Sequence, residues 1–108
     1  MQLMHDVPDL ELLRCFVHLH RERHLTRAAR HAGLSQPAMS RVLGRLRAAF
    51  SDPLFVRTPR GMLPTPRAEL LAPQVEAVLD AAAALVRPAS FDPARLARTF
   101  TIGTVDFS

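Results

Sequence analysis

Apolar residues recur every three or four positions in four separate stretches, which is the spacing of amphipathic helices. The first stretch runs from residue 9 to about residue 23, with Asp9 as a candidate N-cap. Its apolar face is formed by Leu10, Leu13, Phe16, Val17 and His20. The second is short, about residues 27–32, with Thr26 as its candidate cap and Gly33 as the residue that ends it.

The third helix is predicted from "GLSQPAMSRVLGRLRAAF". Ser35 is its candidate cap, and Pro37 falls in the first turn, where a missing backbone N–H costs nothing. The helix is expected to end near Phe50, with an inward face of Met39, Val42, Leu43, Leu46 and Phe50.

A minimal β-hairpin is predicted from the next segment, "PLFVRTPRGMLPTP". Residues 54–57 are β-prone, residues 58–61 have turn chemistry, and Met62 and Leu63 can return as a second short strand.

A long fourth helix should follow, with Thr65 as cap and Pro66 at its first position, and should run to about Val86. Its apolar positions step by four, three, four and three, as in a heptad seam. They are Leu71, Val75, Val78, Ala82 and Leu85. A partner helix is the simplest cover for this face, which predicts a homodimer; the alternative is that the helix packs on its own domain.

The last segment has a different pattern. Residues 87–93 have the composition of a linker, and residues 100–105 alternate apolar and polar like a first strand. One strand cannot form a sheet. We therefore expect a fragment with an N-terminal, mainly helical domain at 1–65, a dimerisation helix at 66–87, and a hinge with the start of a further domain at 88–108.

The distribution of charged residues along the chain gives a first indication of its function. The net charge is +4, and all 14 basic residues are arginine. Between residues 23 and 67 there are nine arginines and one acid, Asp52. Such a basic block is typical of a nucleic-acid footprint, although arginine-rich composition also follows from a GC-rich genome.

The composition also indicates the cellular compartment in which the protein works. The single Cys15 excludes an intrachain disulfide and favours a reducing cytoplasm. No stretch has the length of apolar sequence that a membrane span requires, and the N-terminus lacks the pattern of a signal peptide.

The second and third helices fit a helix-turn-helix, which needs a small residue at the crossing, a glycine in the turn and apolar anchors beyond it. Ala29, Gly33, Met39 and Val42 occupy those positions. The leading end of the third helix should then meet base edges in the DNA major groove.

The residues on that end have suitable chemistry. Gln and Arg make bidentate base contacts, while Pro and Ala contact a thymine methyl group. The candidates are Gln36, Pro37, Ala38, Ser40 and Arg41, with Arg45 one turn later either on DNA or in solvent. Arg47 points away from this row and is expected to meet an acid or solvent.

The motifs "LSQPAMSRVLGRL", "DPLFVRTPRG" and "LPTPRAELL" together resemble the DNA-binding domain of LysR-type transcriptional regulators. The resemblance covers residues 10 to about 86. It implies a mainly α winged helix-turn-helix, with a short two-stranded wing and a long linker helix that pairs antiparallel with its copy. It further implies a tetramer for the full-length protein and a small-molecule inducer for the domain beyond this chain, with no cofactor here.

By the same resemblance, DNA contacts fall on the opening of the third helix, its serine and arginine, and the wing. These are Ser35, Gln36, Pro37, Ser40, Arg41, Arg57 and Arg60, to which Thr26 and Thr65 are added. The chain departs from the family pattern in four places. A family Gly-Ser pair is Arg23-His24, a leucine is Ala32, an acid is Arg47, and a glycine is Ala68.

Two other constellations suggest chemistry without requiring it. Cys15, His18, His20 and His24 are spaced as possible metal ligands, but structural zinc sites draw on two separated ligand pairs. Cys15 beside His18 resembles a nucleophile and base, but nothing supplies an orienting acid, and helix cysteines usually pack in cores. We expect no metal site and no enzyme. The remaining alternative is a dimerisation module that binds DNA without sequence preference.

Overall fold

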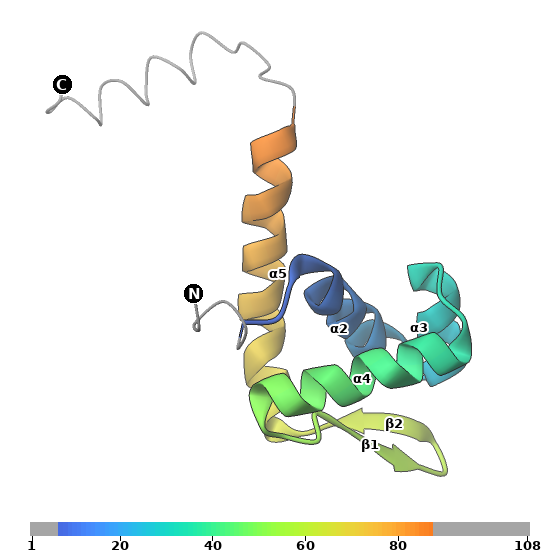
Figure 1. Ribbon diagram of the computed structural model, residues 1–108. Helices are drawn as coiled ribbons and strands as arrows, with labels where there is room; N and C mark the ends of the chain where they lie inside the picture. Colours follow the sequence, from blue (N-terminus) through green and yellow to red (C-terminus); the bar gives the residue numbers. More distant parts are fainter. Residues whose placement is uncertain (1–6, 88–108) are drawn as a thin grey trace, which may run out of the picture.

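The computed structural model describes residues 7–87, which form four helices and one hairpin. In order, the elements are α2 (Leu10–Glu22), α3 (Leu25–Ala32), α4 (Gln36–Phe50), β1 (Phe55–Thr58), β2 (Gly61–Pro64) and α5 (Pro66–Val86). Figure 1 shows α2 crossing behind α4, the hairpin below α4, and α5 standing at one side. This confirms the mainly α winged helix-turn-helix. The expected hinge and further domain at 88–108 lie outside the described residues.

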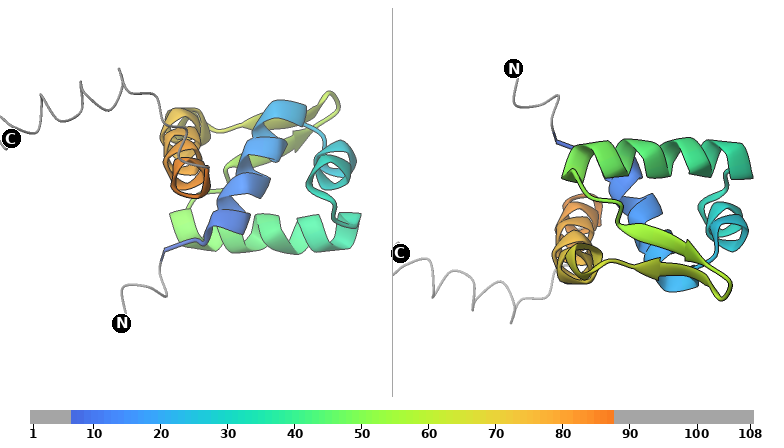
Figure 2. Two further views of the ribbon diagram at one scale, coloured as in Figure 1. Left: turned by 90° about the horizontal axis from the view of Figure 1, so that it is seen from above. Right: turned by 90° about the horizontal axis from the view of Figure 1, so that it is seen from below.

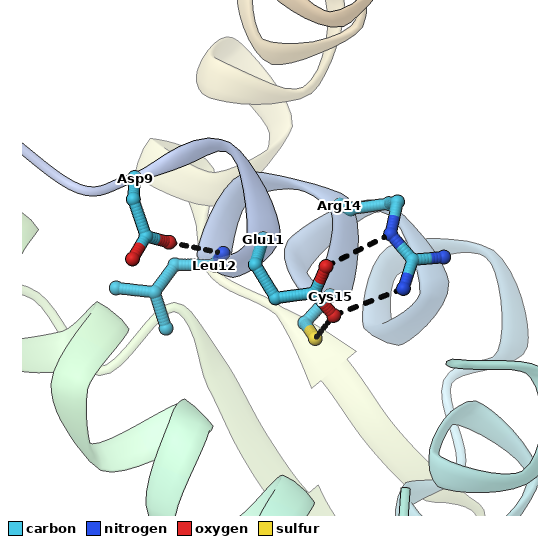
Figure 3. Close-up of polar contacts among 5 residues, drawn as sticks. All are labelled: Asp9, Glu11, Leu12, Arg14 and Cys15. Carbon is cyan, nitrogen blue, oxygen red and sulfur yellow. Dashed lines mark hydrogen bonds and ion pairs between the residues drawn. The ribbon is translucent and has the colours of Figure 1, made fainter. Parts of the chain in front are cut away.

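Three helices begin at the predicted caps. The side chain of Asp9 accepts the N–H of Leu12 at 2.9 Å, as Figure 3 shows beside the paired Glu11 and Arg14. Ser35 caps α4 and Thr65 caps α5 by the same i→i+3 bond. Each bond satisfies a backbone N–H that has no partner inside the helix.

The predicted start of α3 is wrong. The helix begins at Leu25, and its N-cap is His24, whose Nδ1 accepts the N–H of Arg27 at 3.3 Å. Thr26 already lies within the first turn, so its hydroxyl is not the cap. His24 has the extended backbone of a cap (φ −154°, ψ 120°).

The hairpin is shifted by one residue from its predicted start. Its antiparallel register pairs Phe55 with Pro64 and Thr58 with Gly61. Leu54 is excluded from β1 because its φ of 62° is left-handed. A left-handed residue cannot continue the extended strand backbone.

The core lies where α2, α3, α4 and the hairpin meet. Phe16 and Phe55 are fully buried, with ring centroids 5.4 Å apart, and Met39 and Leu46 approach from α4. Burial of these large side chains is the main stabilisation of the domain. Because Met39 and Leu46 are buried, one face of α4 packs on the core and the opposite face is exposed to solvent.

The five heptad positions of α5 differ in burial: two are buried, Ala82 is half-buried and two are exposed. Leu71 and Val75 are 9% and 4% exposed because they pack on the domain's own core, whereas Val78 and Leu85 are 47% and 86% exposed. The expectation of one continuous partner-facing seam is therefore corrected for Leu71 and Val75. In Figure 1 the later turns of α5 extend beyond the other helices.

Polar pairs join α2 to the first turns of α5. Nε2 of His20 lies 2.8 Å from Oε1 of Glu69, and Arg21 lies 3.5 Å from Glu76. His20 as hydrogen-bond partner is the main reason that the pKa of Glu69 lies below its usual value. Within residues 7–87, no helix has the length and apolarity to cross a membrane.

Candidate nucleic-acid interface

The outward face of α4 carries the predicted base-contacting residues. Ser35, Gln36, Pro37, Ser40, Arg41 and Arg45 are all exposed, and Ala38 is half-buried. Within the described part of the chain, neither Arg41 nor Arg45 has an acidic partner. Their guanidinium groups are therefore available to an external acceptor.

The structure gives Thr26 a role that the sequence did not indicate. Its hydroxyl donates to Oε1 of Gln36 at 3.2 Å, across the turn between α3 and α4. With the amide oxygen held in this way, the Nε2 group of Gln36 is left as a donor. Thr26 thus orients a predicted base-contacting side chain.

The turn of the wing is held by one hydroxyl. Oγ1 of Thr58 donates to the carbonyl of Gly61 at 2.8 Å and accepts the N–H of Arg60 at 3.1 Å. The turn presents Arg57 and Arg60, both exposed. These two arginines also lack an acidic partner among the described residues.

The wing is attached directly to the junction between α2 and α3. The N–H of Met62 donates to the carbonyl of Arg23 at 2.9 Å. A Cβ on Gly61 would lie 2.6 Å from that same carbonyl oxygen, and Gly61 has a φ of 116°. Only glycine permits this approach and this backbone conformation.

A groove separates the wing from the helix-turn-helix. It is lined by His24, Thr26 and Gln36 on one side and by the wing turn, including Arg57 and Arg60, on the other. Figure 2 shows the wing turn and α3 together at the end of the molecule remote from α5. The lining contains two arginines and no carboxylate, which suits an anionic ligand.

The C-terminal end of α4 is bound to the wing instead of being open to a ligand. Nε and Nη2 of Arg47 donate to the carbonyls of Pro53 and Phe55, each at 2.8 Å. Arg47 is exposed to solvent, as one of the two expected alternatives had it, but among the described residues its guanidinium pairs with backbone carbonyls and not with an acid. Its planar fork satisfies two acceptors at once.

Thr65 belongs to the same joint. Its hydroxyl donates to Oδ2 of Asp52 at 2.7 Å and accepts the N–H of Ala68, while its own N–H donates to Leu54. Asp52 also accepts the N–H of Leu54 at 2.8 Å. The Thr65 hydroxyl and then the Leu54 N–H hold the pKa of the Asp52 carboxyl below its usual value. These contacts explain Thr65 as a structural residue, and its predicted DNA contact stays a prediction.

The alternative chemical sites are not assembled. Cys15 is fully buried, and burial raises the pKa of its thiol, which disfavours the nucleophilic thiolate. Burial, followed by the nearby Arg14, lowers the pKa of His18. Among residues 7–87, no three side chains of His, Cys, Asp or Glu are grouped as a metal site.

Comparison with known proteins identifies the family. The sequence model of the bacterial regulatory helix-turn-helix proteins of the lysR family matches residues 10–69 of this chain. The chain belongs to this family. It therefore carries a LysR-type helix-turn-helix DNA-binding domain, and its relatives are transcription regulators.

Two relatives illustrate the extent of the match. Nodulation protein D 1 of Rhizobium leguminosarum bv. phaseoli is 46% identical over 101 residues, covering 93% of this chain and 32% of the relative. The transcriptional activator NahR of Pseudomonas putida is 46% identical over 99 residues, covering 91% and 33%. The chain thus spans about a third of the length of these relatives.

Solved structures agree with the fold. OxyR of Corynebacterium glutamicum superimposes with a TM-score of 0.71 and 34% identity, over 74% of this chain and 26% of that one. The DNA-binding domain of CbnR, solved with DNA, superimposes with a TM-score of 0.66 over 70% of this chain and 87% of that domain. At 22% identity the second likeness concerns the fold alone.

The structure explains the departure at the Gly-Ser position of the family. Arg23 has the left-handed φ of 53° that a glycine adopts without strain, and it ends α2. His24 caps α3 in place of serine. The side chain of His24 also lines the groove.

Proposed function

We propose that this LysR-type domain reads duplex DNA as a two-fold homodimer, with α4 in the major groove and the wing near the minor groove. The observation that carries this proposal is the division of α4 into a buried face and an exposed face. Gln36, Ser40 and Arg41 stand on the exposed face without being needed by the core. Gln and Arg side chains there suit bidentate contacts to adenine and guanine.

Recognition by Gln36 is tested on a site selected from a pool of random-sequence duplexes. Gln36→Ala should lose roughly 1–3 kcal/mol on that site and little on random DNA, because base contacts carry specificity and phosphate contacts do not. Competition binding measures both values. An equal loss on both DNAs would mean that Gln36 only positions the backbone, as in a module without sequence preference.

Thr26→Val provides a matched variant within this test. It keeps the size of the side chain and removes the hydroxyl that donates to Gln36. The selected site should be bound a few-fold more weakly, in the same direction as with Gln36→Ala but by less. If the two losses add in the double variant, Thr26 does not act through Gln36.

We also propose that the exposed later turns of α5 form the dimer contact. Val78 and Leu85 are the exposed members of the heptad set, and Val86 is 82% exposed beside them. Large apolar side chains left bare along one helix suit a partner helix. In a two-fold dimer the two α4 helices would read half-sites about one helical turn, or a multiple of it, apart.

Val78→Glu tests this contact without opening the core. Because Val78 is half-exposed in the single chain, a charge there should leave the fold intact and shift the protein toward monomer. Ala83→Glu, at another exposed α5 position, is the matched control and should remain dimeric. Sedimentation equilibrium decides; wild-type protein that is monomeric at high micromolar concentration contradicts the proposal.

A further inference from the structure

We propose that His24 binds a backbone phosphate of duplex DNA in the groove between α3 and the wing, donating through Nε2–H. The proposal rests on the DNA-binding function given above and assigns one contact within it. The side chain of His24 lines this groove together with the wing turn.

The cap of α3 determines which ring nitrogen carries the proton. A backbone N–H can only donate, so Nδ1 of His24, which accepts from Arg27, is unprotonated. In the neutral ring the hydrogen is then on Nε2. The structure shows no hydrogen-bond partner for this nitrogen among residues 7–87, and the side chain is exposed.

The wing brings cations to the same groove. The contact of Met62 with the carbonyl of Arg23 places the wing against the residue that precedes His24. Arg57 and Arg60 line the groove opposite His24, and no acid lines it. A phosphate there would meet two guanidinium groups and one neutral N–H donor.

The environment of the other α3 histidine is different. His31 lies at the far end of the helix, 3.3 Å from Oε2 of Glu22, and does not line the groove. A ring beside a carboxylate is poorly placed for a phosphate. His31 therefore provides the matched control for His24 on the same helix.

The experiment compares His24→Ser and His31→Ser on a random-sequence duplex, since a phosphate contact does not depend on sequence. Serine is a strong N-cap, so His24→Ser should keep or raise the melting temperature. Its affinity should fall about tenfold, the loss of a hydrogen bond to a charged acceptor. The salt slope should not change, because the lost donor is uncharged. His31→Ser should match wild type in all three measurements.

Several outcomes overturn the proposal. Unchanged affinity for His24→Ser means that the ring is only a cap, and so does a loss of affinity that follows a fall in melting temperature. A reduced salt slope contradicts the neutral donor. Wild-type protein that binds no duplex removes the proposed function as well, whereas normal wild-type binding with an unaffected variant removes this contact alone.

A second, spectroscopic experiment tests whether the groove binds DNA phosphate or any free phosphate. In nitrogen-15-labelled protein, the Nε2 resonance of His24 should shift when the random-sequence duplex is added. Inorganic phosphate at the same phosphate concentration should leave it unchanged. An equal shift with inorganic phosphate would make the groove a general anion site and overturn the assignment to DNA.

Discussion

The two ends of α4 place arginines in different environments. At the N-terminal end and the adjacent wing turn, which we call the reading edge, Arg41, Arg57 and Arg60 are exposed and have no acidic partner among the described residues. At the C-terminal end, which we call the anchor, Arg47 is committed to two backbone carbonyls. Asp52 and Thr65 complete the anchor.

This difference shows that an arginine's role depends on its partners more than on its charge. An arginine that satisfies two internal carbonyls has a structural role, so its charge alone does not make it a candidate DNA ligand. The anchor also fixes the wing relative to α4, so it sets the spacing between the backbone segments that carry the exposed arginines of the reading edge. Preorganisation of this kind lowers the entropy cost of binding.

The largest effect is expected at the reading edge. Arg57→Ala combined with Arg60→Ala should weaken binding to a random-sequence duplex by about one to two orders of magnitude at roughly 0.1 M salt. The salt slope should fall by about two units per protomer if each arginine meets one phosphate. Affinity measured over a salt series gives both values.

Arg14→Ala combined with Arg21→Ala makes the same change in net charge elsewhere. Both arginines pair with glutamates, Glu11 and Glu76, away from the groove. This variant should bind DNA nearly as wild type does. If the two double variants lose equal affinity, net charge alone drives binding and the reading edge is not distinct.

Substitutions in the anchor should change the stability of the domain and not its affinity for DNA. Arg47→Ala leaves the carbonyls of Pro53 and Phe55 without their donor and should lower the free energy of unfolding by about 1–3 kcal/mol. For a domain of this size that corresponds to a fall in melting temperature of roughly 5–20 °C. Arg45→Ala, on the same helix but without an acidic partner among residues 7–87, should leave the melting temperature unchanged. Equal melting temperatures for both variants would remove the distinction between the two ends.

Local signals predicted much of this architecture. Ser35 and Thr65 were identifiable as caps because the donor that each satisfies lies three residues away. The cap at His24 was missed because histidine is not among the preferred cap residues. The exposed face of α4 follows from its apolar periodicity, whereas the candidate DNA contacts rest on the side-chain chemistry at its leading end and on the family resemblance.

Contacts between segments were not predictable in this way. Arg47 binds carbonyls whose position depends on the left-handed backbone of Leu54, a conformation without a signature in the sequence. The heptad positions of α5 could not reveal that Leu71 and Val75 face their own core while Val78 does not. The same apolar spacing therefore includes both core-facing and exposed positions.

The smallest effect expected is a pH dependence carried by Asp52 in the anchor. Donation from Thr65 and Leu54 holds the pKa of its carboxyl below its usual 3.8 in the folded state. Protonation is therefore harder in the folded than in the unfolded chain. The carboxylate contributes stability that is present above its usual pKa and lost as the pH falls through the lower folded pKa. Asp52→Asn removes this titration.

Melting temperatures of wild type and Asp52→Asn, measured from about pH 6 to about pH 3, isolate that contribution. The difference between them should shrink as the pH falls, because protonated Asp52 in wild type also loses its charge. Asp80→Asn removes an exposed carboxylate of α5 that is outside the anchor, and its difference from wild type should change less. A constant difference for Asp52→Asn would show that the anchor depends on the shape of this side chain and not on its charge, which leaves the hydrogen bonds of Arg47 as its main polar support.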